Sequence, residues 1–160
     1  MAPTNHRPWL HIRPWCVGAA VLAALAAGWA PVPKPRPAKP DPVKEELRRL
    51  QGEWEEVSES LHGVERPSAP GRALDAYRGD RVTVRGPDGK VSARWRVALD
   101  PTRSPKHMDL VGEKGKLVRC LYELDGDALT VCNGTDPKAR PKALSPGQGV
   151  WVRKLKRKKP

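Results

Sequence analysis

The feature that most constrains the fold of this chain is the stretch Leu117–Cys132, in which two apolar-rich runs flank Asp125-Gly126-Asp127. Glycine adopts a positive φ at no steric cost, and an Asp-Gly pair between alternating hydrophobic residues is a strong signal for a β-hairpin. The two runs are rich in the aliphatic, β-branched and aromatic residues that fit a pleated surface. The sequence therefore predicts a hairpin here and more strands of the same sheet on either side.

The neighbouring segments repeat this pattern of short strands and turns. Val91–Leu99 alternates apolar and polar residues, as a half-buried antiparallel strand does, and the turn residues of Gly86–Gly89 precede it. Residues 65–72, with two prolines and a glycine, are expected to form a loop. Further strands are expected at residues 54–61, 73–77, 81–85, 107–111 and 150–155. About eight short strands with short connections indicate an all-β antiparallel barrel or sandwich in which neighbours pair.

One short helix is expected before the first strand, at Val43–Leu50. Acidic residues lie near its start and basic residues near its end, which is the charge order that the helix dipole favours. Its apolar residues, Val43, Leu47 and Leu50, fall on one helical face, so the helix can flank or plug the sheet.

The N-terminal region has the pattern of an export signal. Two arginines and no acidic residue precede an alanine-rich apolar run that ends at Ala30, which is typical of a secretory signal peptide. The uncharged window Trp15–Val32 is 18 residues long, which also reaches the roughly 17–25 residues that a membrane anchor needs. We therefore expect residues 1–30 to be a signal peptide or membrane anchor and the protein to reach the periplasm or cell envelope. The proline-rich segment 31–42 is expected to be an extended linker.

The positive charge is concentrated at the two ends of the chain. The whole chain carries a net charge of +12, of which residues 43–152 contribute only +2 and residues 153–160 contribute +6. A nucleic-acid-binding domain carries its basic residues on a folded face, so no nucleic-acid partner is expected. Apolar periodicity stops after Leu155, which predicts a barrel domain at 43–156 and a solvated basic tail at 157–160. Basic residues from Arg153 onward are candidates for contact with an anionic membrane or polymer.

The two cysteines of the predicted hairpin are expected to remain unpaired. On the first arm Cys120 shares a face with Val118 and Tyr122, whereas on the second arm Cys132 lies opposite to the face of Leu129 and Val131. If the apolar set of each arm faces the core, Cys120 points inward and Cys132 outward. Side chains on opposite faces of paired strands do not meet the geometry of a disulfide.

No catalytic or metal-binding constellation is visible, and no cofactor is expected. The carboxylates of Glu53, Glu55, Glu56 and Glu59 are interpreted as a solvated strand face rather than an acid–base pair. His62 and His107 lack the context of a nucleophile, and the histidines and cysteines lack metal-ligand spacing. Three aromatic residues are weak candidates for contact with a ligand: Trp54, Trp95 and Tyr122. Trp95 and Trp151 can line a pocket or fill the core, since a small barrel is either filled or holds one small ligand.

Five separated motifs resemble a known family. They are Leu47–Trp54, Pro105–Leu110, Tyr122–Asp127 with Leu129 and Cys132, Arg140-Pro141, and Pro146–Gly149. In order and spacing they are similar to the uncharacterised small domain abundant in planctomycete envelope proteins, a lipocalin-like barrel family, over roughly residues 43–156. The resemblance implies a lipocalin-like fold behind an export signal, and no known reaction, cofactor or ligand.

The Gly52-x-Trp54 element also resembles the first-strand signature of true lipocalins. In that family the tryptophan closes one end of the barrel and packs against a basic residue late in the chain, for which Arg153 or Lys154 is the candidate here. Even so, a core tryptophan without any closing role explains Trp54 equally well.

These observations favour an exported or membrane-tethered binding or interaction module whose ligand is unknown. The partner would be a small apolar molecule or a component of the envelope. An envelope hydrolase or other enzyme with an unrecognised site is the first alternative, and a deep pocket in which His107 and carboxylates converge would favour it. A structural protein of the envelope is the second alternative.

Overall fold

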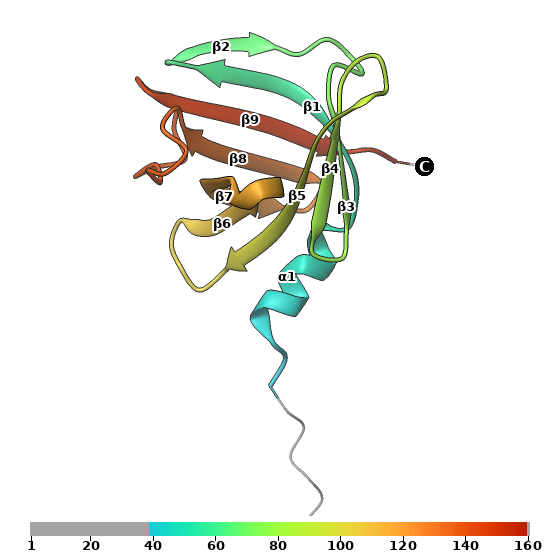
Figure 1. The fold of residues 1–160 in the computed structure, drawn as a ribbon, viewed down its shortest axis with the longest axis vertical. Helices are drawn as coiled ribbons and strands as arrows, with labels where there is room; N and C mark the ends of the chain where they lie inside the picture. Colours follow the sequence, from blue (N-terminus) through green and yellow to red (C-terminus); the bar gives the residue numbers. More distant parts are fainter. Residues whose placement is uncertain (1–38, 160) are drawn as a thin grey trace, which may run out of the picture. The chain divides into compact units, whose positions relative to one another are not determined.

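The computed structural model describes residues 39–159, so the predicted signal or anchor segment and most of the predicted linker lie outside the described residues. The described part is mostly β, with one α-helix (Figure 1). Its elements are α1 (Pro42–Leu50), β1 (Gly52–Leu61), β2 (Val64–Pro67), β3 (Leu74–Arg78), β4 (Arg81–Arg85), β5 (Val91–Asp100), β6 (Lys106–Val111), the short 3₁₀ helix η1 (Glu113–Gly115), β7 (Leu117–Asp125), β8 (Ala128–Gly134) and β9 (Val150–Arg157). Within residues 39–159, none of the helices has the length and apolar character needed to span a membrane.

Eight of the strands close into an antiparallel barrel. The strands from β3 to β9 pair in chain order, β1 pairs with β3, and β9 pairs back with β1 to complete the ring. The predicted all-β, eight-stranded antiparallel barrel with one short N-terminal helix is therefore confirmed. Each of the eight strands of the ring pairs with a neighbour on both sides over at least part of its length, so the sandwich alternative is excluded.

The strand β2 lies outside the ring and pairs only with β1. The sequence did not predict this strand, and residues 65–67 were expected to belong to a loop. β3 pairs only with Gly52–Glu55, in the first half of β1. The same edge of β1 remains free at Ser58–Leu61, and β2 folds back to pair there. The expectation of a loop over residues 65–72 is thus wrong for its first three residues, because an unpaired edge of a long strand is available to them.

The predicted hairpin is formed by β7 and β8, with Leu124 opposite Leu129 and only Gly126 and Asp127 in the loop. Gly126 has a φ of +53° at the first of these two positions, where type II′ turns place glycine. The hairpin confirms the predicted faces of the two cysteines. Cys120 belongs to the cluster inside the barrel, and Cys132 belongs to a second cluster outside it, where Leu144 of the β8–β9 connection packs.

The helix α1 covers one end of the barrel, which we call the closed end. It begins at Pro42, one residue earlier than predicted, because the Asp41 side chain accepts a hydrogen bond of 2.9 Å from the Val43 amide and caps the helix. Leu50 is fully buried in the interior cluster, and Leu47 packs against it. The side chain of Gln51 hydrogen-bonds to both the amide and the carbonyl of Gly79, which ties the end of α1 to the β3–β4 turn.

The C-terminal residues are packed further than predicted. β9 runs to Arg157, whose guanidinium carbon lies 4.1 Å from the centre of the Trp54 ring. The same guanidinium donates to the carbonyl oxygens of Arg49 and Gln51 and to the carboxylate of Asp127. The expectation of a solvated tail beginning at residue 157 is therefore wrong for Arg157, because a charged side chain that lacks apolar periodicity still packs when an aromatic face and backbone acceptors meet it.

Candidate functional site

A cavity of about 620 Å³ occupies the other end of the barrel, which we call the open end. It lies inside the ring of strands and reaches the surface beside Leu61 and Arg72, which are both exposed. Most of the exposed surface of its wall is apolar, and each strand from β4 to β8 contributes at least one apolar side chain to it. A volume of this size is within the usual range of roughly 300–1,000 Å³ for small-molecule sites.

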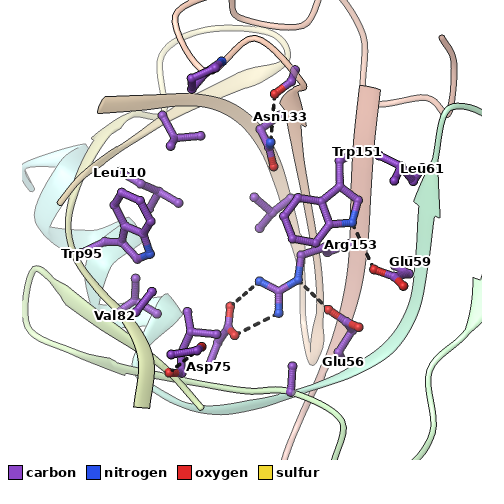
Figure 2. A pocket seen from close by; sticks show the side chains of 18 of the residues that line it. Glu56, Glu59, Leu61, Asp75, Val82, Trp95, Leu110, Asn133, Trp151 and Arg153 are labelled. Carbon is purple, nitrogen blue, oxygen red and sulfur yellow. Dashed lines mark hydrogen bonds and ion pairs between the residues drawn. The ribbon is translucent and has the colours of Figure 1, made fainter. Parts of the chain in front are cut away.

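Two tryptophans face the cavity from opposite sides (Figure 2). Trp95 comes from β5, on the face that the alternation of Val91–Leu99 predicted to point inward. Trp151 comes from β9, and its indole N–H donates to a carboxylate oxygen of Glu59 over 3.2 Å. That hydrogen bond holds the Trp151 ring in place, because the same carboxylate is also paired with Arg72 at 2.6 Å.

The base of the cavity is an ion cluster formed by Arg153, Asp75 and Glu56 (Figure 2). The two terminal nitrogens of Arg153 each donate to one oxygen of Asp75 over 3.0 Å, in the fork geometry that suits a carboxylate. The Nε of Arg153 donates to Glu56 over 2.6 Å, and the Ser68 hydroxyl donates to the other oxygen of Glu56 over 2.7 Å. Each of these side chains is therefore held in one orientation.

This cluster is buried and carries one more carboxylate than cation. The side chains of Glu56, Asp75 and Arg153 are only 3%, 4% and 12% exposed. Burial disfavours the charged form of Arg153, but Asp75 and Glu56 outweigh that effect and raise the pKa of the guanidinium. Burial, and then the nearby negative charge of Asp75, raise the pKa of the Tyr77 hydroxyl, which lines the cavity beside the cluster. The cavity therefore ends in a polar base with excess negative charge.

Sequence reasoning missed this cluster. The interpretation of Glu53, Glu55, Glu56 and Glu59 as a solvated face is wrong for Glu56, which is buried, and for Glu59, which lines the cavity with a side chain that is only 16% exposed. Arg153, the partner of Glu56, lies 97 residues further along the chain. The sequence nevertheless contained a signal, because residues two apart on a strand share a face. Asp75 shares a face with Tyr77, and Arg153 shares a face with Trp151 and Leu155. A charged residue at an inward position of an alternating strand indicates either a buried ion pair or a site.

The three ligand-contact candidates are separated by the fold. Trp95 lines the cavity, whereas Trp54 and Tyr122 are fully buried and absent from its lining. The Trp54 indole N–H donates to the Leu50 carbonyl over 2.8 Å, and the ring stacks against Arg157. The basic partner proposed for Trp54 was Arg153 or Lys154, and this expectation is wrong because the β1–β9 register places Arg157 directly opposite Trp54.

Tyr122 belongs to a second buried polar group, at the closed end. Its hydroxyl donates to Glu46 of α1 over 3.3 Å, and Lys106 pairs with the same glutamate at 2.5 Å. Arg49 binds the other oxygen of Glu46 over 3.0 Å. Because Glu46 is satisfied on all sides, this group attaches α1 to β6 and β7 rather than forming a site for a ligand.

The chemistry of the open end favours binding. Arg153 occupies oxygens of both Glu56 and Asp75, so the two carboxylates are held by a cation rather than poised around an open reaction centre. His107 does not line the cavity, and the Ser92 hydroxyl at its wall donates to the Val84 carbonyl. No cluster of three or more potential metal-ligating residues is found in residues 39–159.

Comparisons of the chain with protein-family models, with curated proteins and with solved structures find no match.

Proposed function

We propose that the barrel is a binding module for a small, mostly apolar molecule, which it holds in the cavity at the open end. The observation that carries this proposal is a cavity of about 620 Å³ between Trp95 and Trp151 that ends in the buried Arg153–Asp75–Glu56 cluster. Apolar walls with a few fixed polar groups are the usual composition of a site for a small molecule. The walls supply affinity by excluding water, and the polar base orients the ligand.

The charges at the base of the cavity also determine which chemical group of the ligand can lie against it. It has two carboxylates for one guanidinium, so a group that donates hydrogen bonds is favoured there and a carboxylate is disfavoured. The apolar body of the ligand then lies against the two tryptophans and side chains such as Leu110 and Val131. A ligand of this kind is an apolar amine, amide or alcohol rather than a fatty acid inserted with its carboxylate first.

Titration of the full-length chain with N-phenyl-1-naphthylamine tests the proposal, because this neutral apolar probe carries one N–H donor and becomes fluorescent in apolar surroundings. We expect saturable binding of one probe per chain. In the variant Ala93→Phe, a phenyl ring enters the cavity from β5, and we expect binding to weaken at least tenfold.

The matched control is Ala98→Phe, because Ala98 is on the same strand but is exposed and is not part of the lining. This variant should bind the probe as the wild type does. Absence of saturable binding, or equal loss in both variants, would contradict a ligand in this cavity. Native mass spectrometry of the protein purified from its host then identifies a resident molecule by its mass.

We also propose that the domain acts outside the cytoplasm, tethered or released after its N-terminal segment. The support is the basic and then apolar character of residues 1–30, followed by the proline-rich segment 31–42. The five family-like motifs and the stacking of Arg157 on Trp54, which resembles the closure of true lipocalins, support a lipocalin-like envelope protein. Its partner is then a small envelope component. Cell fractionation tests this, and a signal confined to the cytoplasm would contradict it.

A further inference from the structure

The outer face of β3, β4 and β5 carries three arginines in one row, Arg78, Arg81 and Arg96, which we call the arginine row. The register places Arg78 directly opposite Arg81, and Arg81 directly opposite Arg96. Residues directly opposite each other in an antiparallel pair project on the same side of the sheet. The neighbours Tyr77, Val82 and Val97 are buried inside, so the row faces outward.

The arginine row is exposed and has no ion-pair partner among residues 39–159. Most of the other arginines of the barrel domain behave differently, because they pair with a carboxylate: Arg48, Arg49, Arg72, Arg103, Arg140, Arg153 and Arg157. Like charges directly opposite each other destabilise a sheet. Three arginines in one row therefore lower the stability of the fold. Because the row does not stabilise the fold, its presence indicates a role in binding.

A hollow of about 360 Å³ lies beside this row on the outside of the barrel. Arg81, Arg94 and Arg96 line it together with the hydroxyl-bearing Thr83 and the carboxylate of Glu113. Arg94 is next to Arg96 on the same face of β5 and opposite Thr83. Neighbouring strands are about 4.8 Å apart, so guanidinium groups from β4 and β5 can reach one ligand at the same time.

We propose that this hollow is a binding site for a compact anion with at least two negative charges, such as a phosphate monoester or a pyrophosphate. Guanidinium groups bind phosphate oxygens through paired hydrogen bonds, and the Thr83 hydroxyl adds a neutral donor. Carboxylates interrupt the positive area. Glu113 lines the hollow itself, and Asp80 directly precedes Arg81 in the chain. An extended polyanion would meet these carboxylates, whereas a compact anion fits between them.

Isothermal titration of the full-length chain with sodium pyrophosphate at low ionic strength tests the site. We expect one pyrophosphate per chain, with affinity that falls as sodium chloride is raised. The double variant Arg81→Gln/Arg96→Gln should bind at least tenfold more weakly. Arg66→Gln on β2 is the matched control, because Arg66 is an exposed arginine that does not line the hollow; it should change the affinity less than twofold.

Thermal melts verify that the double variant remains folded, and relief of like-charge repulsion predicts an unchanged or higher Tm. Equal weakening by the double variant and by Arg66→Gln would overturn the site in favour of general charge attraction. Binding of heparin or single-stranded DNA without binding of pyrophosphate would overturn the compact site in favour of an extended surface. The variant Ala93→Phe, which fills the internal cavity, should leave pyrophosphate binding unchanged, so this test is independent of the proposed ligand at the open end.

Discussion

The two ends of the barrel are built from the same pair of strands and have opposite characters. At the closed end Trp54 of β1 packs against Arg157 of β9. At the open end Trp151 and Arg153 both come from β9, and they hydrogen-bond to Glu59 and Glu56 of β1. Arg157 donates to the carbonyls of Arg49 in α1 and of Gln51 directly after it, and the helix packs Leu47 and Leu50 into the interior cluster. Arg153 is held by two carboxylates, and a cavity remains above it. The same residue types stabilise the fold at one end and form a candidate site at the other, because only one end is covered by the helix.

The largest expected effect comes from removing the tryptophan of the closed end. Trp54 is fully buried, and truncating a buried tryptophan lowers the free energy of unfolding by about 3–5 kcal/mol. Trp151→Ala should lower it by only about 1 kcal/mol, because its ring already borders an empty cavity and leaves little new void. Denaturant unfolding of both variants measures the difference. Equal losses would show that the two ends are equally packed.

The second prediction concerns the buried charge at the open end. Arg153→Met leaves Glu56 and Asp75 buried without their cation, and we expect a loss of about 3 kcal/mol in unfolding free energy. Glu56→Gln is the matched change, because it keeps the shape and removes the excess negative charge, and it should cost less than about 1 kcal/mol. Denaturant unfolding of both variants measures the two losses in unfolding free energy, and a larger loss for Arg153→Met shows that charge pairing stabilises the cluster. A smaller loss for Arg153→Met than for Glu56→Gln would contradict this account.

The third prediction concerns the C-terminal residues. Arg157→Ala removes the cation that stacks on Trp54 and donates to the carbonyls of α1, and we expect a loss of about 2 kcal/mol. Lys156→Ala, one residue earlier, changes an exposed side chain for which no ion pair or side-chain hydrogen bond is found in residues 39–159, and should change stability by less than about 0.5 kcal/mol. If thermal melts place both variants at the wild-type Tm, Arg157 does not hold the closed end.

The last prediction concerns the filled interior between the two ends, where the effect is small near pH 8.5 and grows at more alkaline pH. Burial raises the pKa of Cys120 to about 12, whereas a thiol in the unfolded chain titrates near pH 8.5. Above that pH the unfolded state loses its proton and the folded state keeps it, so stability falls as the pH rises from about 8.5 to 10. Cys120→Ala should flatten this decline when unfolding is measured at several pH values. An identical slope in the variant would show that Cys120 is not buried in its neutral form.

Some of the fold could be predicted because it depends on neighbours in the chain. The hairpin followed from Gly126 and its flanking residues, and the inward face of β5 followed from the alternation that includes Trp95. The opposite faces of Cys120 and Cys132 followed from the same period of two. The strand β2 could not be predicted in this way, because it depends on where β3 stops pairing with β1.

The candidate site could be predicted only in part. The sequence pointed to Trp95 as a residue of the inner face, but it did not distinguish a filled barrel from a hollow one. It assigned Trp54 correctly to a buried position and chose the wrong basic partner for it. The shift in register between Glu56 and Ser58 changes which side of β1 faces inward, so Glu56 and Glu59 both line the cavity. Such a bulge leaves no simple pattern in the sequence.

The sequence by itself determined the class of the fold, the hairpin at its centre and the faces of its alternating strands, because these depend on backbone sterics and on burial along one strand. The tertiary structure alone decided which end of the barrel is filled. The closing of β9 onto β1 brings Arg157 to Trp54 and Arg153 to Glu56, across separations of about a hundred residues. The register of that closure is set by the whole ring of strands, so no short stretch of sequence contains it.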